Sequence, residues 1–428
     1  MTQAKTLYVF TDATINGKQE LVGKLVVDNG LGEFHYAPDW LSNSNAFALD
    51  PINLPLSSTP TKTKMNEGVF NVLLDSGPDK WGKQLMTRLQ QKPPRDNIEL
   101  LLYSSGGSGA LHYSLSRSAT SLRNRADSIY IAPDVLINYI NTIQNNTELP
   151  SFIRAALFAG SSLGGARPKL LIRDLDGTEY IAKLNKEDDH LNVARIELSM
   201  LHLAKAIGIQ VSPAKVNTLD GRDSFWIKRF DRVDGLNLHY ISAHSLLNGH
   251  RWRTGDDGKH SSYAGIASVV RKISTHPKED CLELYKRAAL NILVGNTDDH
   301  LKNHGFVRDQ NGYRLSPVFD IVPQINQTKL QAIGVGEDRT STFDNLLLRH
   351  NDFYLTPEAA AKEISTVINT VTALVSGIFN ANSVSQQDAD IVLSIIKEKS
   401  QTACAPAFAA LRENDHEQIH QVRNKRAP

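Results

Sequence analysis

The first part of the chain carries short apolar runs rich in Leu, Val and aromatic residues, a pattern that predicts β-strands. Leu7–Phe10 and Glu20–Val27 are such runs, and Asn16-Gly17 between them is typical of a tight hairpin turn. Residues 41–65 are rich in Pro, Ser and Thr and predict a loop. Helical periodicity follows near Asp79–Leu89. We therefore expect a β-rich beginning.

The middle of the chain predicts a second set of strands around one amphipathic helix. Between about His190 and Ile207 apolar residues recur every three or four positions, and Gly208 is a suitable residue to end the helix. The strands expected around this helix are Lys169–Arg173, Glu179–Leu184, Val211–Val216 and Ser224–Phe230.

The remainder is expected to be mainly helical. Pro277 is a good first-turn residue for a helix that reaches Val294 and stops at Gly295. The other expected elements are a hairpin over Gly305–Leu315 and helices over about Pro357–Phe379 and Val384–Lys399. These patterns predict an α+β chain with a β-rich subdomain over residues 1–125, a small lobe over 150–240 and a helical lobe over 241–428.

Charge and cysteine content narrow the class of protein. Lys and Arg number 47 against 46 Asp and Glu, and this balance argues against nucleic acid as the main ligand. The two cysteines are too few for a disulfide framework or a cysteine zinc site, and they fit a reducing compartment. We read neither a secretory signal nor an apolar run near the roughly 20 residues that span a bilayer. A cytoplasmic protein without a membrane partner is therefore expected.

Chemistry-bearing residues follow one another between residues 158 and 320 in the order used for phosphoryl transfer from ATP. The glycines Gly164-Gly165 would let backbone N–H groups approach phosphates closely. Lys183, on a predicted strand, would supply a positive charge to the phosphates. Glu197, on the following helix, would hold that lysine in place.

The second half of this order supplies carboxylates and an amide. Asp298 would accept or orient the proton of the attacking hydroxyl. Asn303 lies five residues later, and Asp320 follows the hairpin as a metal-binding Asp does in protein kinases. Oxygen ligands of this kind suit Mg²⁺. Asp299 is a second candidate base, but the five-residue spacing to Asn303 favours Asp298.

Each of these residues also has a purely structural explanation. Two glycines can form an ordinary turn, a strand lysine can face solvent, and Asp is favoured at helix caps. A zinc site is a further alternative, because His300 and His304 are four residues apart. The position that holds Glu in the H-E-x-x-H motif is Leu301, and Lys302 adds positive charge, so the zinc alternative is the weaker one.

The motifs taken together resemble those of HipA-family kinases. The resemblance covers nearly the whole chain, although His-Arg-Asp and G-x-G-x-x-G motifs are missing from the sequence. Its segments are the N-terminal Tyr36–Leu41, the glycine-rich Ser161–Lys169, the lysine strand Tyr180–Lys183, the hinge Trp226–Arg232, the catalytic loop Gly295–Asn303 and the metal segment Pro317–Ile321.

The resemblance implies a two-lobed, protein-kinase-like fold related to lipid kinases, and a serine/threonine kinase toxin that uses ATP and Mg²⁺. It implies Asp298 as the catalytic base, Asn303 and Asp320 as metal ligands, and Glu197 as partner of Lys183. Ser162 would be the site of autophosphorylation, with Ser161 as the less favoured neighbour. The implied ATP-binding residues are Ser162, Leu163, Gly164, Gly165, Ala166, Lys183, Ile227, Lys228, Arg229 and Phe230.

The same resemblance implies a HipB-like helix-turn-helix antitoxin as partner, with DNA contacted mainly through that antitoxin. Known targets in the family belong to translation and include aminoacyl-tRNA synthetases. Two other functions stay open at this point. The chain could be a non-catalytic co-repressor scaffold that binds the antitoxin, or an atypical kinase for a small molecule or lipid, because fold does not fix substrate.

Overall fold

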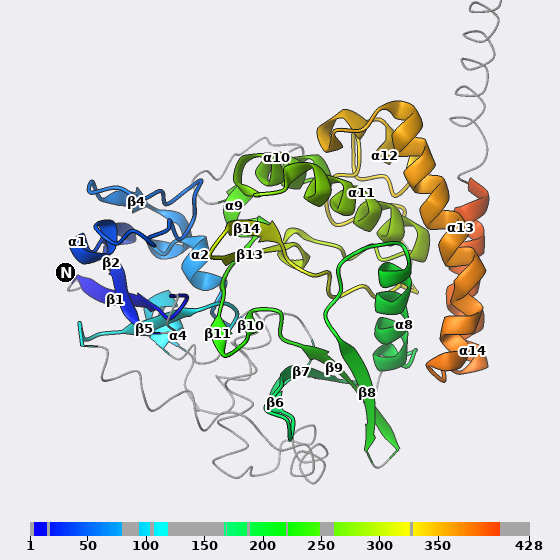
Figure 1. The fold of residues 1–428 in the computed structure, drawn as a ribbon, viewed down its shortest axis with the longest axis horizontal. Coiled ribbons are helices and arrows are strands. Elements are labelled where there is room, and N and C mark those ends of the chain that lie inside the picture. Colours follow the sequence, from blue (N-terminus) through cyan, green and yellow to red (C-terminus); the bar gives the residue numbers. More distant parts are fainter. Residues whose placement is uncertain are drawn as a thin grey trace, which may run out of the picture.

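The computed structural model describes residues 4–14, 18–78, 94–102, 107–118, 167, 169–185, 189–219, 221–248, 261–325 and 328–402. Several predicted features lie outside these residues: the Asn16-Gly17 turn, the helix near Asp79–Leu89 and the glycine-rich positions 161–166. The described part mixes helices and sheets, as the sequence predicts (Figure 1).

An antiparallel sheet in the order β4-β3-β2-β1-β5 forms the N-terminal end of the molecule (Figure 1). In β3, buried residues alternate with partly exposed ones, which places Phe34 and Tyr36 in the core. The sequence predicted a loop over residues 41–65, and this was wrong at Thr61–Thr63, which form the short strand β4. The elements are β1 (Lys5–Thr11), β2 (Glu20–Asp28), β3 (Leu31–Tyr36), α1 (Pro38–Leu41), β4 (Thr61–Thr63), η1 (Met65–Glu67), α2 (Asn71–Leu74), α4 (Asn97–Leu102) and β5 (Leu111–Ser114).

A second antiparallel sheet, in the order β6-β7-β9-β8, packs against helix α8 (Figure 1). Strands β6 and β7 have the predicted bounds, and α8 begins three residues later than predicted, after the cap Asn192. Directly paired residues share a face of a sheet, so Lys183 lies on the same face as Lys169 and Phe225. The elements are β6 (Lys169–Arg173), β7 (Glu179–Leu184), α8 (Val193–Ala206), β8 (Ala214–Leu219) and β9 (Arg222–Lys228).

The helical lobe is built around α11, whose residues from Ala288 to Val294 are fully buried. This helix has the predicted bounds and ends at Gly295, which adopts the left-handed conformation that favours glycine. The elements are β10 (Arg232–Val233), β11 (Leu236–Asn237), β12 (His239–Ser242), α9 (Ala243–Asn248), α10 (Tyr263–Ile273), α11 (Pro277–Val294), η3 (Leu301–Asn303), β13 (Gly305–Asp309), β14 (Gly312–Leu315), α12 (Phe343–Leu347), η4 (His350–Phe353), α13 (Pro357–Ala381) and α14 (Gln386–Thr402).

Hydrogen bonds join the N-terminal part to the helical lobe. Asn53 donates through Nδ2 to the carbonyl oxygens of Ser245 and Leu246, at 3.1 and 3.0 Å. The buried His239 contacts the carbonyl oxygen of Leu49 through Nε2 at 2.8 Å. These contacts fix where the two parts meet. The predicted domain boundaries at residues 125, 150 and 240 stay a prediction.

Helix α13 is long and apolar enough to cross a membrane by length and composition, a feature that the sequence reading missed. Its large apolar residues recur every three or four positions on one face, which is buried in the core shared with α8 and α11. Packing within the protein accounts for this apolar face. The residues that form it are Ile364, Val367, Val371, Val375 and Phe379.

Candidate functional site

Three predicted site residues from three separate segments meet in one ionic cluster. The Lys183 ammonium on β7 donates to Glu197 Oε1 on α8 at 2.6 Å and to Asp320 Oδ1 at 2.6 Å. Glu197 is almost completely buried, whereas the Asp320 side chain keeps 39% of its surface exposed. Lys183 is therefore held from one side by a buried carboxylate and from the other by one that solvent can reach.

The charges in this cluster shift one another's ionisation. Burial lowers the pKa of Lys183, but Asp320 and Glu197 outweigh burial and leave that pKa raised. Lys183, with a smaller contribution from Lys169, holds the pKa of Asp320 well below its usual range. Burial raises the pKa of Glu197, and Lys183 offsets this only in part. At neutral pH the lysine is charged and the exposed Asp320 is ionised.

Asp320 also has an unusual backbone. Its φ of 63° lies in the left-handed region, which costs an ordinary L-residue roughly 1–2 kcal/mol. Such backbone conformations persist only where surrounding structure imposes them, and they cluster at functional sites. Asn296 donates through Nδ2 to the Asp320 carbonyl oxygen at 3.5 Å, which connects this residue to the loop after α11.

In the loop after α11, the neighbouring residues Asp298 and Asp299 have different surroundings. Asp298 is exposed, whereas Asp299 is buried with 3% of its surface accessible. The Asp299 carboxylate accepts from the Tyr263 hydroxyl, from Asn291 Nδ2 at 2.8 Å and from His304 Nε2 at 2.9 Å. Asp299 is thus committed to anchoring the loop. The exposed Asp298 is the carboxylate that a substrate could reach.

The same loop holds Asn303, a candidate metal ligand, and the two histidines that suggested zinc. The amide of Asn303 is buried, and its Nδ2 donates to the Asp298 carbonyl oxygen at 3.4 Å. This contact leaves the Oδ1 atom as the group that could bind a cation. The spacing that suggested zinc does not form one helical face, because Leu301–Asn303 is a 3₁₀ turn and His304 lies after it. Among the described residues, no cluster of three or more His, Cys, Asp and Glu side chains could hold a metal ion.

In the predicted hinge, Arg229 forms a buried ion pair. The buried Arg229 pairs with Asp231 through Nε at 3.0 Å and Nη2 at 2.8 Å, and donates to the Gly107 carbonyl oxygen at 2.8 Å. Burial raises the pKa of Asp231, but Arg229 and Arg232 outweigh it and leave that pKa well below its usual range. The predicted contact between Arg229 and nucleotide stays a prediction.

The other hinge residues differ from one another in their surroundings. Phe230 stacks on Phe319, the residue before Asp320, with ring centroids 5.7 Å apart and planes 27° apart. Ile227 is buried on the sheet face that carries Lys183, and Lys228 is exposed. The ring stack connects the hinge to the Asp320 segment. The predicted residues Ser161, Ser162, Leu163, Gly164, Gly165 and Ala166 lie outside the described residues.

Sequence reasoning missed two features of the site. Lys169 lies directly opposite Lys183 on the neighbouring strand and is buried, so it adds a second cation to this face. The strand period of two, applied to both predicted strands, could have revealed it. The anchoring of Asp299 by Tyr263 joins residues 36 positions apart, and nothing in the local sequence signals it.

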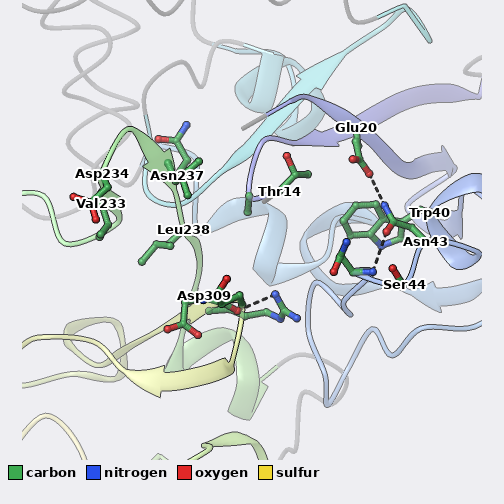
Figure 2. A pocket seen from close by; sticks show the side chains of 15 residues that line it. Thr14, Glu20, Trp40, Asn43, Ser44, Val233, Asp234, Asn237, Leu238 and Asp309 are labelled. Carbon is green, nitrogen blue, oxygen red and sulfur yellow. Dashed lines mark hydrogen bonds between the residues drawn. The ribbon is translucent and has the colours of Figure 1, made fainter. Parts of the chain in front are cut away.

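A separate pocket of about 440 Å³ lies between the N-terminal sheet and the β13–β14 hairpin (Figure 2). Glu20 and Asn43, joined by a hydrogen bond of 2.7 Å, line one side, and Asp234 and Asp309 line the other (Figure 2). None of the predicted site residues lines this pocket. It is therefore distinct from the ionic cluster.

Two family models match the sequence. The model of the HipA N-terminal domain matches residues 13–114, and the model of the HipA-like C-terminal domain matches residues 161–375. Together they include both the N-terminal sheet and the ionic cluster.

Individual proteins match at low identity. The serine/threonine-protein kinase toxin HipA of Shewanella oneidensis is 22% identical over 333 residues, which are 71% of this chain and 72% of that protein. The protein Y4mE of Sinorhizobium fredii is 27% identical over 181 residues, which are 38% of this chain and 42% of Y4mE. The match thus spans less than half the length of that relative.

A solved structure shares the fold. HipA of Shewanella oneidensis, in a complex with HipB and operator DNA, superposes with a TM-score of 0.67 at 18% sequence identity. The superposition covers 93% of this chain and 96% of that one. The two-lobed architecture with its N-terminal β-rich part is therefore the fold of HipA, as the sequence motifs predict.

Proposed function

Since the chain belongs to the HipA family, we propose that it is an ATP- and Mg²⁺-dependent serine/threonine protein kinase that acts as the toxin of a toxin–antitoxin pair. The observation that carries this proposal is the contact of Lys183 with both Glu197 and Asp320 at 2.6 Å. A lysine held by a helix glutamate, next to a metal-binding aspartate, is the arrangement that kinases use to orient phosphates.

The residues divide the chemistry between them. Lys183 would place its charge against the phosphates, and Glu197 would fix the position of the lysine. Asp298 would accept the proton of the substrate hydroxyl while that oxygen bonds to the γ-phosphorus. The bond from the γ-phosphorus to its bridging oxygen breaks in the same step, so ADP leaves with the electron pair and the phosphate ester stays on the substrate. The exposed position of Asp298 supports this role.

The residues proposed to hold Mg²⁺ fit that ion by donor chemistry. Asp320 offers a carboxylate that solvent can reach, and Asn303 offers an amide oxygen on the adjoining loop. Oxygen donors are the ligands that Mg²⁺ prefers, and the bound ion would neutralise phosphate charge. Because Asp320 contacts Lys183 in this structure, both residues would have to share the space around the phosphates.

The nucleotide itself would lie along the hinge and the glycine-rich segment. We propose that Ile227–Phe230 face the adenine and that Leu163–Ala166 contribute backbone N–H groups to the phosphates. Phosphorylation of Ser162, or less favourably Ser161, would add about −2 charge where ATP phosphates bind. Such a modification would therefore switch the kinase off.

For the partner, we propose a HipB-like helix-turn-helix antitoxin that contacts operator DNA on behalf of the pair. The related Shewanella oneidensis structure contains HipA, HipB and operator DNA, which supports this choice. The net charge of +1 agrees with indirect DNA contact. The substrate we propose is a protein of translation, with aminoacyl-tRNA synthetases as the first candidates. Co-purification with the antitoxin, tested by size-exclusion chromatography, examines the partner separately.

Transfer of labelled γ-phosphate from ATP to protein tests the proposed activity. We expect transfer by the wild type, its loss in Asp298→Asn and its loss when Mg²⁺ is chelated. Asp176→Asn, in the exposed β6–β7 turn, is a matched control that should keep full activity. Label on a metabolite but never on protein would favour a small-molecule kinase instead. An inactive wild type that still binds the antitoxin would favour a co-repressor scaffold.

A further inference from the structure

Helix α8 carries Glu197, so the position of this helix decides whether the carboxylate reaches Lys183. Two residues along an α-helix correspond to a rotation of about 200°, so Arg195 and Glu197 lie on nearly opposite sides of α8. Ser199 and His202 follow Arg195 at four and seven residues and share its face. One face of α8 therefore serves the ionic cluster, and the other is available for a different contact.

That other face contacts the turn between α13 and α14. Arg195 donates through Nη1 to the carbonyl oxygen of Asn382 at 2.9 Å. The Asn382 side chain in turn donates through Nδ2 to Ser199 Oγ at 2.9 Å and lies 3.1 Å from His202 Nδ1. Figure 1 shows α8 beside α13 and α14, at the end of the molecule opposite the N-terminal sheet.

Two carboxylates, those of Asp388 and Asp223, fix the start of α8. The backbone N–H of its cap residue Asn192 donates to Asp388 Oδ2, at the beginning of α14, at 3.2 Å. Asp223 on β9 accepts from Asn192 Nδ2 at 2.7 Å and pairs with the Arg195 guanidinium through Nε. Arg195 thus bridges the sheet that carries Lys183 and the C-terminal helices.

We propose that the α13–α14 turn is a clamp that positions α8, and that Arg195 and Asn382 are positioning residues for the Lys183–Glu197 pair. This inference deepens the proposed kinase function and rests on it for its effect on catalysis. The core beneath α8 is apolar and buried, and its close packing holds the helix against the sheet. The polar clamp adds a directional constraint on the face opposite Glu197, because hydrogen bonds have preferred directions and lengths.

The catalytic consequence follows from the geometry of the pair. Without the clamp, α8 could shift, Glu197 would lose its 2.6 Å contact, and Lys183 would keep only Asp320. A displacement of about 1 Å in such a group can lower the rate about a hundredfold. For Arg195→Ala and Asn382→Ala we expect kcat to fall about ten- to a hundredfold with a smaller change in the KM for ATP.

The experiment combines amide hydrogen exchange with kinetics on the full-length chain. We expect faster exchange of the α8 amides in Arg195→Ala and Asn382→Ala than in the wild type. Lys286→Ala is the control, because the Lys286–Glu363 pair connects α11 to α13 at 3.7 Å and is not part of the clamp. In that control, α8 exchange and kcat should stay as in the wild type.

A double-mutant cycle separates positioning from general destabilisation. If Arg195 acts through Glu197, adding Arg195→Ala to Glu197→Gln should lower kcat little further, whereas unrelated effects add. Unchanged α8 exchange in both clamp variants, equal acceleration in Lys286→Ala, or full additivity would overturn the clamp. If the wild type transfers no phosphate but the clamp variants still accelerate α8 exchange, the kinase proposal fails and the clamp stands.

Discussion

Replacing Glu197 by Gln tests the ionic cluster with almost no change of shape. In the folded protein Glu197 is 1% exposed and accepts from the Lys183 ammonium at 2.6 Å. The substitution removes one charge from a buried, charge-assisted hydrogen bond. Such a bond contributes about 1.5–3 kcal/mol to stability, so we expect the free energy of unfolding to fall by about that amount.

The activity change has a separate cause. The neutral amide introduced by Glu197→Gln cannot compete with the Asp320 carboxylate for the ammonium, so Lys183 would move towards Asp320. We expect about a hundredfold lower kcat, the scale of a 1 Å misplacement.

Asp320→Asn should affect activity more than stability. Its carboxylate is 39% exposed and screened by solvent, so stability should change by less than about 1 kcal/mol while phosphate transfer is lost.

Urea unfolding and steady-state kinetics measure both effects on the same preparations. Asp176→Asn is the matched control, because Asp176 lies in the exposed turn directly before the strand that carries Lys183. We expect that control to change stability by less than about 1 kcal/mol and to keep its activity. Wild-type stability and turnover in Glu197→Gln would refute the assignment of Glu197 as the residue that holds Lys183.

Three further predictions follow from buried polar groups. Asp299→Asn leaves the hydrogen-bond donors around this side chain poorly satisfied. The free energy of unfolding, measured with urea, should fall by about 1–3 kcal/mol. An unchanged urea midpoint would contradict the anchoring role of Asp299. Arg229→Ala leaves Asp231 as a buried charge without its main partner. In the same assay the free energy of unfolding should fall by about 3–5 kcal/mol. A fall of less than about 1 kcal/mol would refute the role of Arg229 as that partner. Burial lowers the pKa of His239 from 6.5 to about 4, so the unfolded chain binds the proton more readily within that window. The free energy of unfolding should therefore fall as pH drops from 6.5 to 4. In His239→Gln, unfolding curves measured across this pH range should show a weaker dependence on pH. The same slope in both proteins would show that another group titrates.

The sequence predicted best the elements whose signals are local. Strands Lys169–Arg173 and Glu179–Leu184 were predicted with correct bounds, because a turn with Asp and Gly separates two short apolar runs. The helix Pro277–Val294 was also correct, since Pro and Gly mark its ends. The short strand Thr61–Thr63 was missed, because three residues in a Ser- and Thr-rich segment carry too little pattern.

The candidate site was predictable in its residue types and only partly in its arrangement. Spacing favoured Asp298 over Asp299, and in the folded chain Asp299 is buried in a network from three segments. The catalytic role of Asp298 stays a prediction. Contacts between distant segments depend on how helices pack. The clamp of Asn382 on Ser199, across 183 positions, is therefore visible only in the folded chain.

Intact mass spectrometry shows whether the ionic cluster of Lys183, Glu197 and Asp320 belongs to a kinase that transfers phosphate from ATP. The mass of the wild type and of Asp298→Ala would be measured before and after incubation with ATP and Mg²⁺. We predict that the wild type alone carries one added phosphate, mapped to Ser162 or Ser161, either as purified or after incubation. A wild type without phosphate at any stage, and without measurable ATP binding, would show that the protein is not an ATP-dependent kinase.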